Sequence, residues 1–243
     1  MSLSSFRARV AAARHDGALY FASLVPEQLI DERFGDARGD WRGWIYCPAL
    51  VVWCFLSQVL SSDHSCRETV AKRNAYRVAH GLSPCSADTG AYCLARDKLP
   101  EAVCHELIHA TAHRAMQDVP QSWLWCGRRV RVVDGSTVTM PDTPANRAEY
   151  PQVPGQKPGC GFPIVRLAVI FCLATGAVLE MALGKYKGKQ TGENSLFRSL
   201  SDVLEPRDVV LADRCYSGRF DIVLLALRGI DVVMRRHHAR WSS

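Results

Sequence analysis

The sequence lacks any apolar run long enough to cross a membrane. The best candidate, Cys47 to Leu60, is shorter than the roughly 18 uncharged apolar residues that a spanning helix requires. The first residues, MSLSSFRARVAAARHDG, also lack the apolar centre of a secretory signal. Both absences favour a cytoplasmic protein with no membrane partner.

The sequence also lacks any closely spaced pair of cysteines. Ten cysteines are present, but they are scattered singly and none forms a CxxC pair. Several fall in apolar runs such as ALVVWCFL and VIFCLA, where a free cysteine behaves as a small hydrophobic residue. The pattern favours reduced core thiols over a disulfide framework or a cysteine-rich metal cluster.

Size and charge leave a broad class of globular protein open. The 243 residues are 48% apolar, which is enough for one large core or two smaller ones. The net charge of +6 is compatible with an anionic partner. Two basic runs lie beside apolar strands, and they include Lys185, Lys187 and Lys189 in the first and Arg235 and Arg236 in the second. Either run could contact phosphates, and either alone is equally well explained as a solvated loop.

Periodicity divides the chain into a helical part and a mixed part. Apolar spacing typical of helices covers 44–118, with Gly81, Pro84 and Pro100 as breaks. We therefore expect 1–118 to be an all-helical N-terminal region that binds DNA, on the resemblance described below. From 129 the runs VRVVDGSTVTM, FPIVRLAVIFCLA and AVLEMALGKY predict three strands, followed by helix, strand, helix and strand. This order predicts an α/β fold with a mixed sheet over 129–243.

The segment 141–162 separates the first two predicted strands. Its sequence, PDTPANRAEYPQVPGQKPGCGF, is rich in proline and glycine. Loops of this length are uncommon in compact domains unless they are functional or mobile. We expect this loop to lie near a substrate.

Residues 105–109, HELIH, match the zinc-binding helix motif of metallopeptidases. The extension that would supply a third histidine is missing, because Ala112 and Ala115 stand where Gly and His are needed. His113 continues the stripe, but ligands one turn apart on a single helix do not all converge on one ion. We expect an amphipathic helix face at His105 and His109, and a zinc peptidase is the less favoured alternative.

Two predicted strands end on an aspartate. Val132-Val133 run into Asp134, and the apolar run from Val209 to Ala212 runs into Asp213. If these strands are neighbours, both carboxylates project into one acidic patch, and hard oxygen ligands favour Mg²⁺ or Mn²⁺. Two such ions would suit attack on a phosphodiester. The alternative is that each aspartate only caps a turn.

The segments VVDGSTVTMPDTPANRAEYPQ, GQKPGCGFPIVRLAVIFCLATGAVLEMALGKYKGKQTGE and DVVLADRCYSG resemble the DDE transposases of bacterial insertion sequences, specifically the insertion sequence 4 family. The match is strong over 129–236 and looser in the helical part. VDGST and ADR followed by an aromatic residue are similar to the first and second aspartate boxes of that family.

This resemblance implies an RNase H-like catalytic domain over 129–243 that cleaves and transfers DNA strands at transposon ends with Mg²⁺ or Mn²⁺. It implies that Asp134 and Asp213 are the first two metal ligands. With DNA as the partner, we expect the two basic runs to contact it through Lys185, Lys187, Lys189, Arg235 and Arg236. It also implies a homodimer in a synaptic complex with transposon ends and target DNA.

The third acid of the family, in a Tyr, Arg, Glu, Lys pattern on a late helix, has no match in this sequence. Glu180, Glu193 and Glu205 fall in the wrong predicted elements, and Glu193 reads as a helix-start residue. We therefore expect the front portion of a transposase, incomplete in its catalytic domain and inactive as it stands. A non-catalytic DNA-binding remnant is the alternative from a different functional class.

Overall fold

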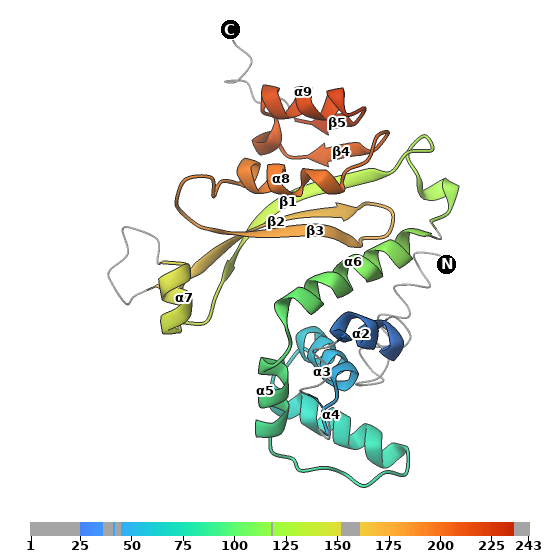
Figure 1. Ribbon diagram of the computed structural model, residues 1–243, viewed down its shortest axis with the longest axis vertical. Helices are drawn as coiled ribbons and strands as arrows, with labels where there is room; N and C mark the ends of the chain where they lie inside the picture. Colours follow the sequence, from blue (N-terminus) through green and yellow to red (C-terminus); the bar gives the residue numbers. More distant parts are fainter. Residues whose placement is uncertain (1–24, 36–40, 42–44, 118, 152–160, 236–243) are drawn as a thin grey trace. The chain divides into compact units, whose positions relative to one another are not determined.

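The computed structural model describes residues 25–35, 41, 45–117, 119–151 and 161–235 (Figure 1). The chain forms two compact units, Met1–Leu107 and Ile108–Ser243. In the described ranges no helix is both long and apolar enough to cross a membrane.

The described part of the first unit is helical, as the periodicity of 44–118 predicts. Its helices are α2 (Glu27–Phe34), α3 (Pro48–Leu60), α4 (Cys66–Ala79), α5 (Gly90–Asp97) and the start of α6 (Glu101–Gln117). The apolar helix α3 packs against α2, α4 and α5. Local signals set the boundaries, because Ser65 Oγ accepts a hydrogen bond from the backbone amide of Glu68 at 3.1 Å in a capping box. Gly81, with φ of 72°, follows the end of α4.

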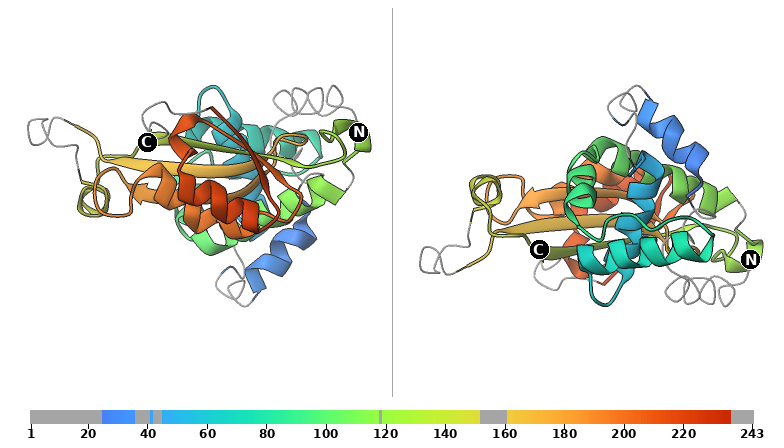
Figure 2. Two further views of the ribbon diagram at one scale, coloured as in Figure 1. Left: turned by 90° about the horizontal axis from the view of Figure 1, so that it is seen from above. Right: turned by 90° about the horizontal axis from the view of Figure 1, so that it is seen from below.

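The second unit contains the sheet. Its strands are β1 (Val130–Thr139), β2 (Ile164–Cys172), β3 (Val178–Lys185), β4 (Val209–Ala212) and β5 (Asp231–Met234), and its helices are the end of α6, α7 (Pro144–Glu149), α8 (Glu193–Leu200) and α9 (Arg219–Leu227). The three strands and the alternating helices and strands after them are confirmed. Helix α7 lies within the long segment expected to be a loop, at the far end of the β1–β2 hairpin (Figures 1 and 2).

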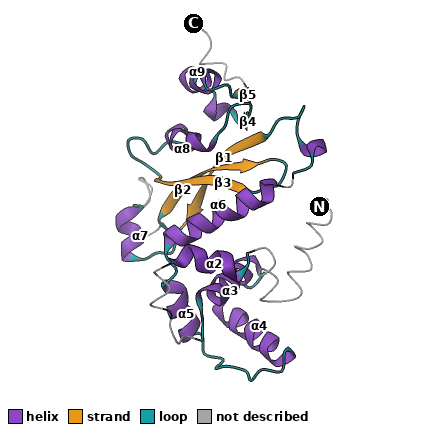
Figure 3. Ribbon diagram, turned by 45° about the vertical axis from the view of Figure 1, so that its right-hand side comes forward, coloured by secondary structure: helices purple, strands orange, loops and turns teal. Residues whose placement is uncertain are grey.

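The strand order is β3-β2-β1-β4-β5 (Figure 3). β2 is antiparallel to β1 and to β3, whereas β1, β4 and β5 are parallel to one another. A hairpin of three strands joined to two parallel strands through crossover helices is the RNase H-like arrangement, so the predicted fold class is confirmed.

The core of the second unit lies between the sheet and α8. Leu196, Phe197 and Leu200 of α8 are buried against Ala168 and Ile170 of β2. Gly184 on β3 permits this contact, because a Cβ there would lie 3.0 Å from Leu196. The other face of the sheet is less covered, since the paired residues Leu211 and Val233 are 37% and 49% exposed.

The described cysteines only partly fit the expected core thiols. Cys54 and Cys172 are buried, whereas Cys126 and Cys215 are exposed and the others are partly buried. All nine cysteines in the described ranges are free thiols. Burial in a core is therefore confirmed for Cys54 and Cys172 and not for the exposed Cys126 and Cys215.

Candidate active site

The register of β1 and β4 brings Asp134 and Asp213 together. These parallel strands pair Val133 with Ala212, and each aspartate is the next residue along its chain. Neighbouring strands lie about 4.7–4.9 Å apart. The two carboxylates therefore project from adjacent positions, as the sequence predicted on the condition that these strands are neighbours. Asp213 follows the end of β4, but the prediction that the first strand ends on Asp134 is wrong, because β1 continues to Thr139 through its pairing with β2.

Each aspartate makes a local hydrogen bond with one oxygen. Asp134 Oδ1 accepts from the amide of Gly135 at 2.8 Å, and Asp213 Oδ1 accepts from the amide of Arg214 at 2.6 Å at the start of the short helix η5 (Arg214–Tyr216). Both residues are exposed. Within the described part of the chain neither forms an ion pair. Turn capping thus accounts for one oxygen of each carboxylate and leaves the other available.

The structure adds a third carboxylate, Glu193, which the sequence correctly predicted to start a helix but did not place at this site. Glu193 is the first residue of α8, and its side chain reaches β1 beside Asp134. A Cβ built on Gly135 would lie 2.9 Å from Glu193 Cδ and 2.8 Å from the hydroxyl of Tyr216. Because real Cβ contacts are almost never this short, glycine is required at 135 for Glu193 and Tyr216 to approach β1.

Tyr216 lies beneath the three carboxylates. Its side chain is 1% exposed and packs edge-on against Phe197, with ring centroids 5.6 Å apart. Its hydroxyl has no hydrogen-bond partner among the described residues. Burial raises the pKa of this phenol well above its ordinary value, and the negative charges of Glu193, Asp134 and Asp213 raise it further. The three carboxylates are therefore close enough to act on one buried group.

The side chains of Asp134, Asp213 and Glu193 are chemically suited to a divalent metal, because carboxylate oxygens are the ligands that Mg²⁺ and Mn²⁺ prefer. The ligand atoms of Asp134, Asp213 and Glu193 do not all lie within 4.8 Å of one another. The site is thus wider than a single ion bound by all three requires. Carboxylates that hold two ions about 3.5–4 Å apart need not converge on one point.

The lysines predicted to bind DNA lie toward the same end of the strands as the two aspartates. Lys185 ends β3 and pairs with Val165, which pairs with Val138 of β1 beyond Asp134. Lys187 and Lys189 are exposed in the loop that leads from β3 to Glu193. Lys185 also forms an exposed ion pair with Glu149 of α7, with Nζ to Oε1 at 3.3 Å.

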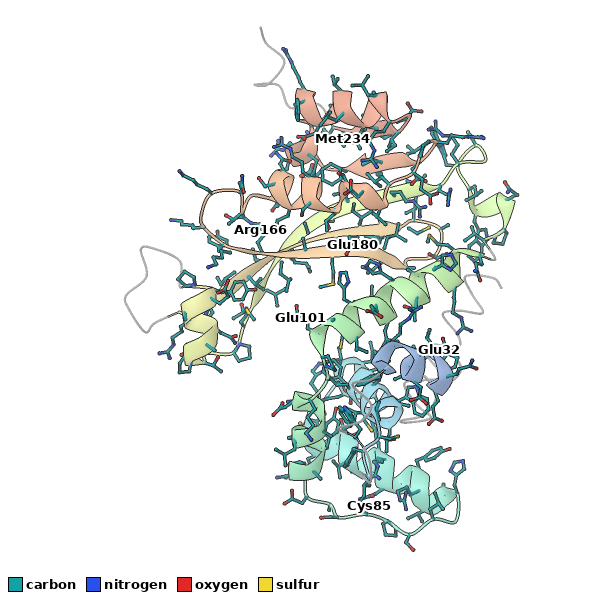
Figure 4. All side chains as sticks on the ribbon, viewed as in Figure 1. Glu32, Cys85, Glu101, Arg166, Glu180 and Met234 are labelled. Carbon is teal, nitrogen blue, oxygen red and sulfur yellow. The ribbon has the colours of Figure 1, made fainter. Side chains whose placement is uncertain are left out.

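The second basic run, Arg235 and Arg236, follows β5 in the sequence, and β5 is next to β4 in the sheet. Arg235 is exposed and directly follows Met234, which pairs with Ala212 before Asp213 (Figure 4). Arg236 lies outside the described residues. The described cations thus flank the carboxylates at the carboxyl ends of parallel strands.

The opposite end of the sheet has a different character. A cavity of about 390 Å³ there is lined by residues that include Arg128, Arg129 and Arg207. It lies at the amino ends of β1 and β4, whereas Asp134 and Asp213 lie just beyond the last paired residues of these two strands, Val133 and Ala212. This cavity is therefore separate from the acidic site.

The HELIH segment lies on α6, and its second histidine contacts the sheet. His109 Nε2 lies 3.2 Å from Glu180 Oε2 of β3 (Figure 4). Glu180 Oε1 accepts a hydrogen bond from the amide of Met181 at 3.0 Å. Glu180 thus belongs to this contact and not to the acidic site.

No protein-family model matches the chain, and no curated protein sequence matches it. Among solved structures, it is similar to a chain in the cryo-EM structure of a piggyBac transposase synaptic complex with hairpin DNA, at 12% identity and a TM-score of 0.46. The similarity covers 95% of this chain and 49% of that one. The present chain therefore spans about half the length of that transposase chain.

Proposed function

We propose that the protein is a DNA transposase of the DDE type, which cleaves and joins strands at insertion-sequence ends with Mg²⁺ or Mn²⁺. The observation that carries this proposal is the register of β1 and β4. It sets Asp134 and Asp213 side by side, directly after the last paired residues of these two parallel strands in an RNase H-like sheet. The resemblance of VDGST and ADRCY to the aspartate boxes of the insertion sequence 4 family supports it.

The two aspartates have the role of metal ligands. Each keeps one carboxylate oxygen free of the local hydrogen bond that orients the side chain. When bound, a pair of divalent ions activates the attacking hydroxyl and stabilises the leaving oxygen of an in-line displacement. The chain contributes rigid placement, because both ligands extend directly from paired strands of the sheet.

The cations around the site have the role of phosphate contacts. Lys185, Lys187, Lys189 and Arg235 lie at the same edge as the aspartates and are exposed, and Arg236 belongs to the same run. Phosphate contacts hold DNA in register without reading its sequence. We assign DNA binding to the helical region 1–118. We expect the protein to act in the cytoplasm, as a homodimer in the synaptic complex.

The proposal is tested by cleavage of DNA that carries the sequences flanking the coding region. The sequence alone predicts an inactive chain because it shows no match to the third acid of the family, but Glu193 lies beside Gly135 in the structure. The purified chain is therefore expected to cut this DNA in Mn²⁺, while Asp134→Ala and Asp213→Ala abolish cutting and leave DNA binding nearly intact. Asp202→Asn, an exposed carboxylate beyond the other end of α8, is the control and is expected to cut normally.

Retained cleavage in either active-site variant would show that the site is misplaced. DNA binding by the unmutated chain with no cleavage in any divalent metal would instead favour the non-catalytic remnant.

A further inference from the structure

We propose that Glu193 is the third carboxylate of the metal site and that the Tyr216 hydroxyl positions it by donating a hydrogen bond. This inference rests on the proposed function, since it takes Asp134 and Asp213 as the first two ligands. It supplies from within the chain a third carboxylate, although Glu193 does not match the family's Tyr, Arg, Glu, Lys pattern.

Helix α8 delivers Glu193 to the site and holds it there. The helix begins at Glu193 after Gly192, and its apolar face is buried on β2 and β3. Arg198, one turn and a half further on, forms two hydrogen bonds with the buried carboxylate of Asp221 on α9, at 2.5 and 3.0 Å. Because α8 is fixed on two sides, the position of its first residue is fixed as well.

The approach of Glu193 to β1 depends on Gly135. Both Cγ and Cδ of Glu193 lie within 3.0 Å of the point where a Cβ would stand. Gly135 directly follows Asp134, and its amide orients the Asp134 carboxylate. One residue therefore both leaves room for the third carboxylate and fixes the first.

The Tyr216 hydroxyl is an independent sign that this cluster binds something. It is buried, lacks a partner among the described residues and points to the space above Gly135 that Glu193 also occupies. A buried hydroxyl without a hydrogen bond is costly. A carboxylate that turns toward an ion within this space would accept that hydrogen bond, and such outer partners orient metal ligands.

A helix-start role alone does not explain this position. The positive end of the helix dipole favours a glutamate there, but that effect is available to a side chain that points into solvent. Glu193 is instead partly buried against β1, close to two other carboxylates. Like charges gathered in this way repel one another unless a cation lies among them.

The test measures Mn²⁺ binding by the full chain, with free Mn²⁺ followed by electron paramagnetic resonance, and thermal melting confirms that each variant is folded. Glu193→Gln and Tyr216→Phe are each expected to weaken Mn²⁺ binding about 10-fold or more, as loss of a ligand or of its outer partner typically does. Asp202→Asn is expected to bind as the unmutated protein does. If Glu193→Gln does not fold, Glu193→Asp keeps the charge, shortens the reach and is expected to bind more weakly.

The outcomes separate this inference from the proposed function. Unchanged affinity in folded Glu193→Gln or Glu193→Asp, with binding lost in Asp213→Asn, would overturn the role of Glu193 and leave the two-aspartate site standing. Unchanged affinity in Tyr216→Phe would overturn the role of the hydroxyl. Unchanged affinity in Asp213→Asn, or no binding by the unmutated chain, would overturn both the inference and the metal site beneath it.

Discussion

The guanidinium of Arg131 and the carboxylate of Asp208 form a buried ion pair, with Nε to Oδ2 at 3.0 Å and side chains 2% and 1% exposed. Arg131 lies near the start of β1, and Asp208 immediately precedes β4. Asp134 and Asp213 lie beyond the other end of the β1–β4 pairing. Charge at one end of this pairing is thus neutralised within the protein, whereas the two aspartates at the other end form no ion pair among the described residues.

Removal of Asp208 should destabilise the second unit strongly. Asp208→Ala leaves Arg131 buried without its partner, and breaking a buried pair in this way costs about 3–5 kcal/mol. Asp231→Ala is the control, because Asp231 is 69% exposed in its ion pair with Arg128, and such pairs contribute about 0–1 kcal/mol. Urea denaturation measures both changes. Equal losses in the free energy of unfolding would show that the buried Arg131–Asp208 pair contributes no more to stability than the exposed pair does.

Substitution of Gly135 should impair the site without removing any ligand. In Gly135→Ala the new methyl group would overlap the ends of the Glu193 and Tyr216 side chains, which can swing away more readily than backbone. We therefore expect Mn²⁺ affinity to fall about 10-fold, as for other losses of ligand orientation, while the protein stays folded. Gly192→Ala is the matched control, since a Cβ there meets nothing within 4 Å. Normal Mn²⁺ binding by Gly135→Ala would contradict the close approach.

The fold could be predicted well from local patterns, and the pairing of its strands could not. β4 is readable because VVLA is an apolar run between turn residues, and α8 because its apolar residues recur at helical spacing. Helix α7 was missed, because its six residues lie in a proline-rich segment and depend on the Thr143 cap. Strand order follows from packing between distant segments, so the adjacency of the aspartates could be stated only as a condition.

The site was predictable for Asp134 and Asp213 and not for Glu193. The two aspartates are marked by their place after apolar strands and by motif resemblance. Glu193 resembles any helix-start glutamate, and its approach to β1 is created by the packing of α8 on the sheet. The local signal that could have found it is Gly135, because glycine inside a strand often marks close approach by another group.

Loss of the three lysines at and after the end of β3 should weaken binding to all DNA sequences alike. Replacing Lys185, Lys187 and Lys189 by alanine is expected to lower affinity and to reduce the slope of log affinity against log salt by about 0.9 for each lost contact. Arg129→Ala, which removes a cation at the amino end of β1, should leave the slope unchanged. Fluorescence anisotropy at several salt concentrations measures this. A slope unaffected by the triple substitution would exclude these lysines from the DNA contact.

The buried thiol of Cys54 should be unreactive at neutral pH. Burial raises its pKa from 9.0 to about 12, so the reactive thiolate is scarce. The exposed Cys126 should be alkylated by iodoacetamide at pH 8 while Cys54 is spared until denaturant is added, as peptide mass spectrometry would show. Because the folded-state pKa is raised, the stabilisation linked to this group is present below pH 9.0 and is lost as the pH rises toward 12. Equal labelling of both cysteines in the native protein would contradict this burial.

The purified protein should contain no stoichiometric zinc, despite its HELIH segment. The structure does supply a nearby carboxylate that the motif alone lacks, because Glu180 contacts His109 at 3.2 Å. However, Oε1 of Glu180 already accepts a hydrogen bond from the amide of Met181, and the His113 stripe on the same helix does not converge on one ion with His105 and His109. A catalytic zinc needs three ligands that are free to bind it and an open fourth position. Elemental analysis of the unmutated protein and of His109→Ala is expected to find no zinc in either, and added Zn²⁺ should not raise the melting temperature. One zinc per chain that is lost in both His109→Ala and Glu180→Gln would establish a metal site on this helix instead.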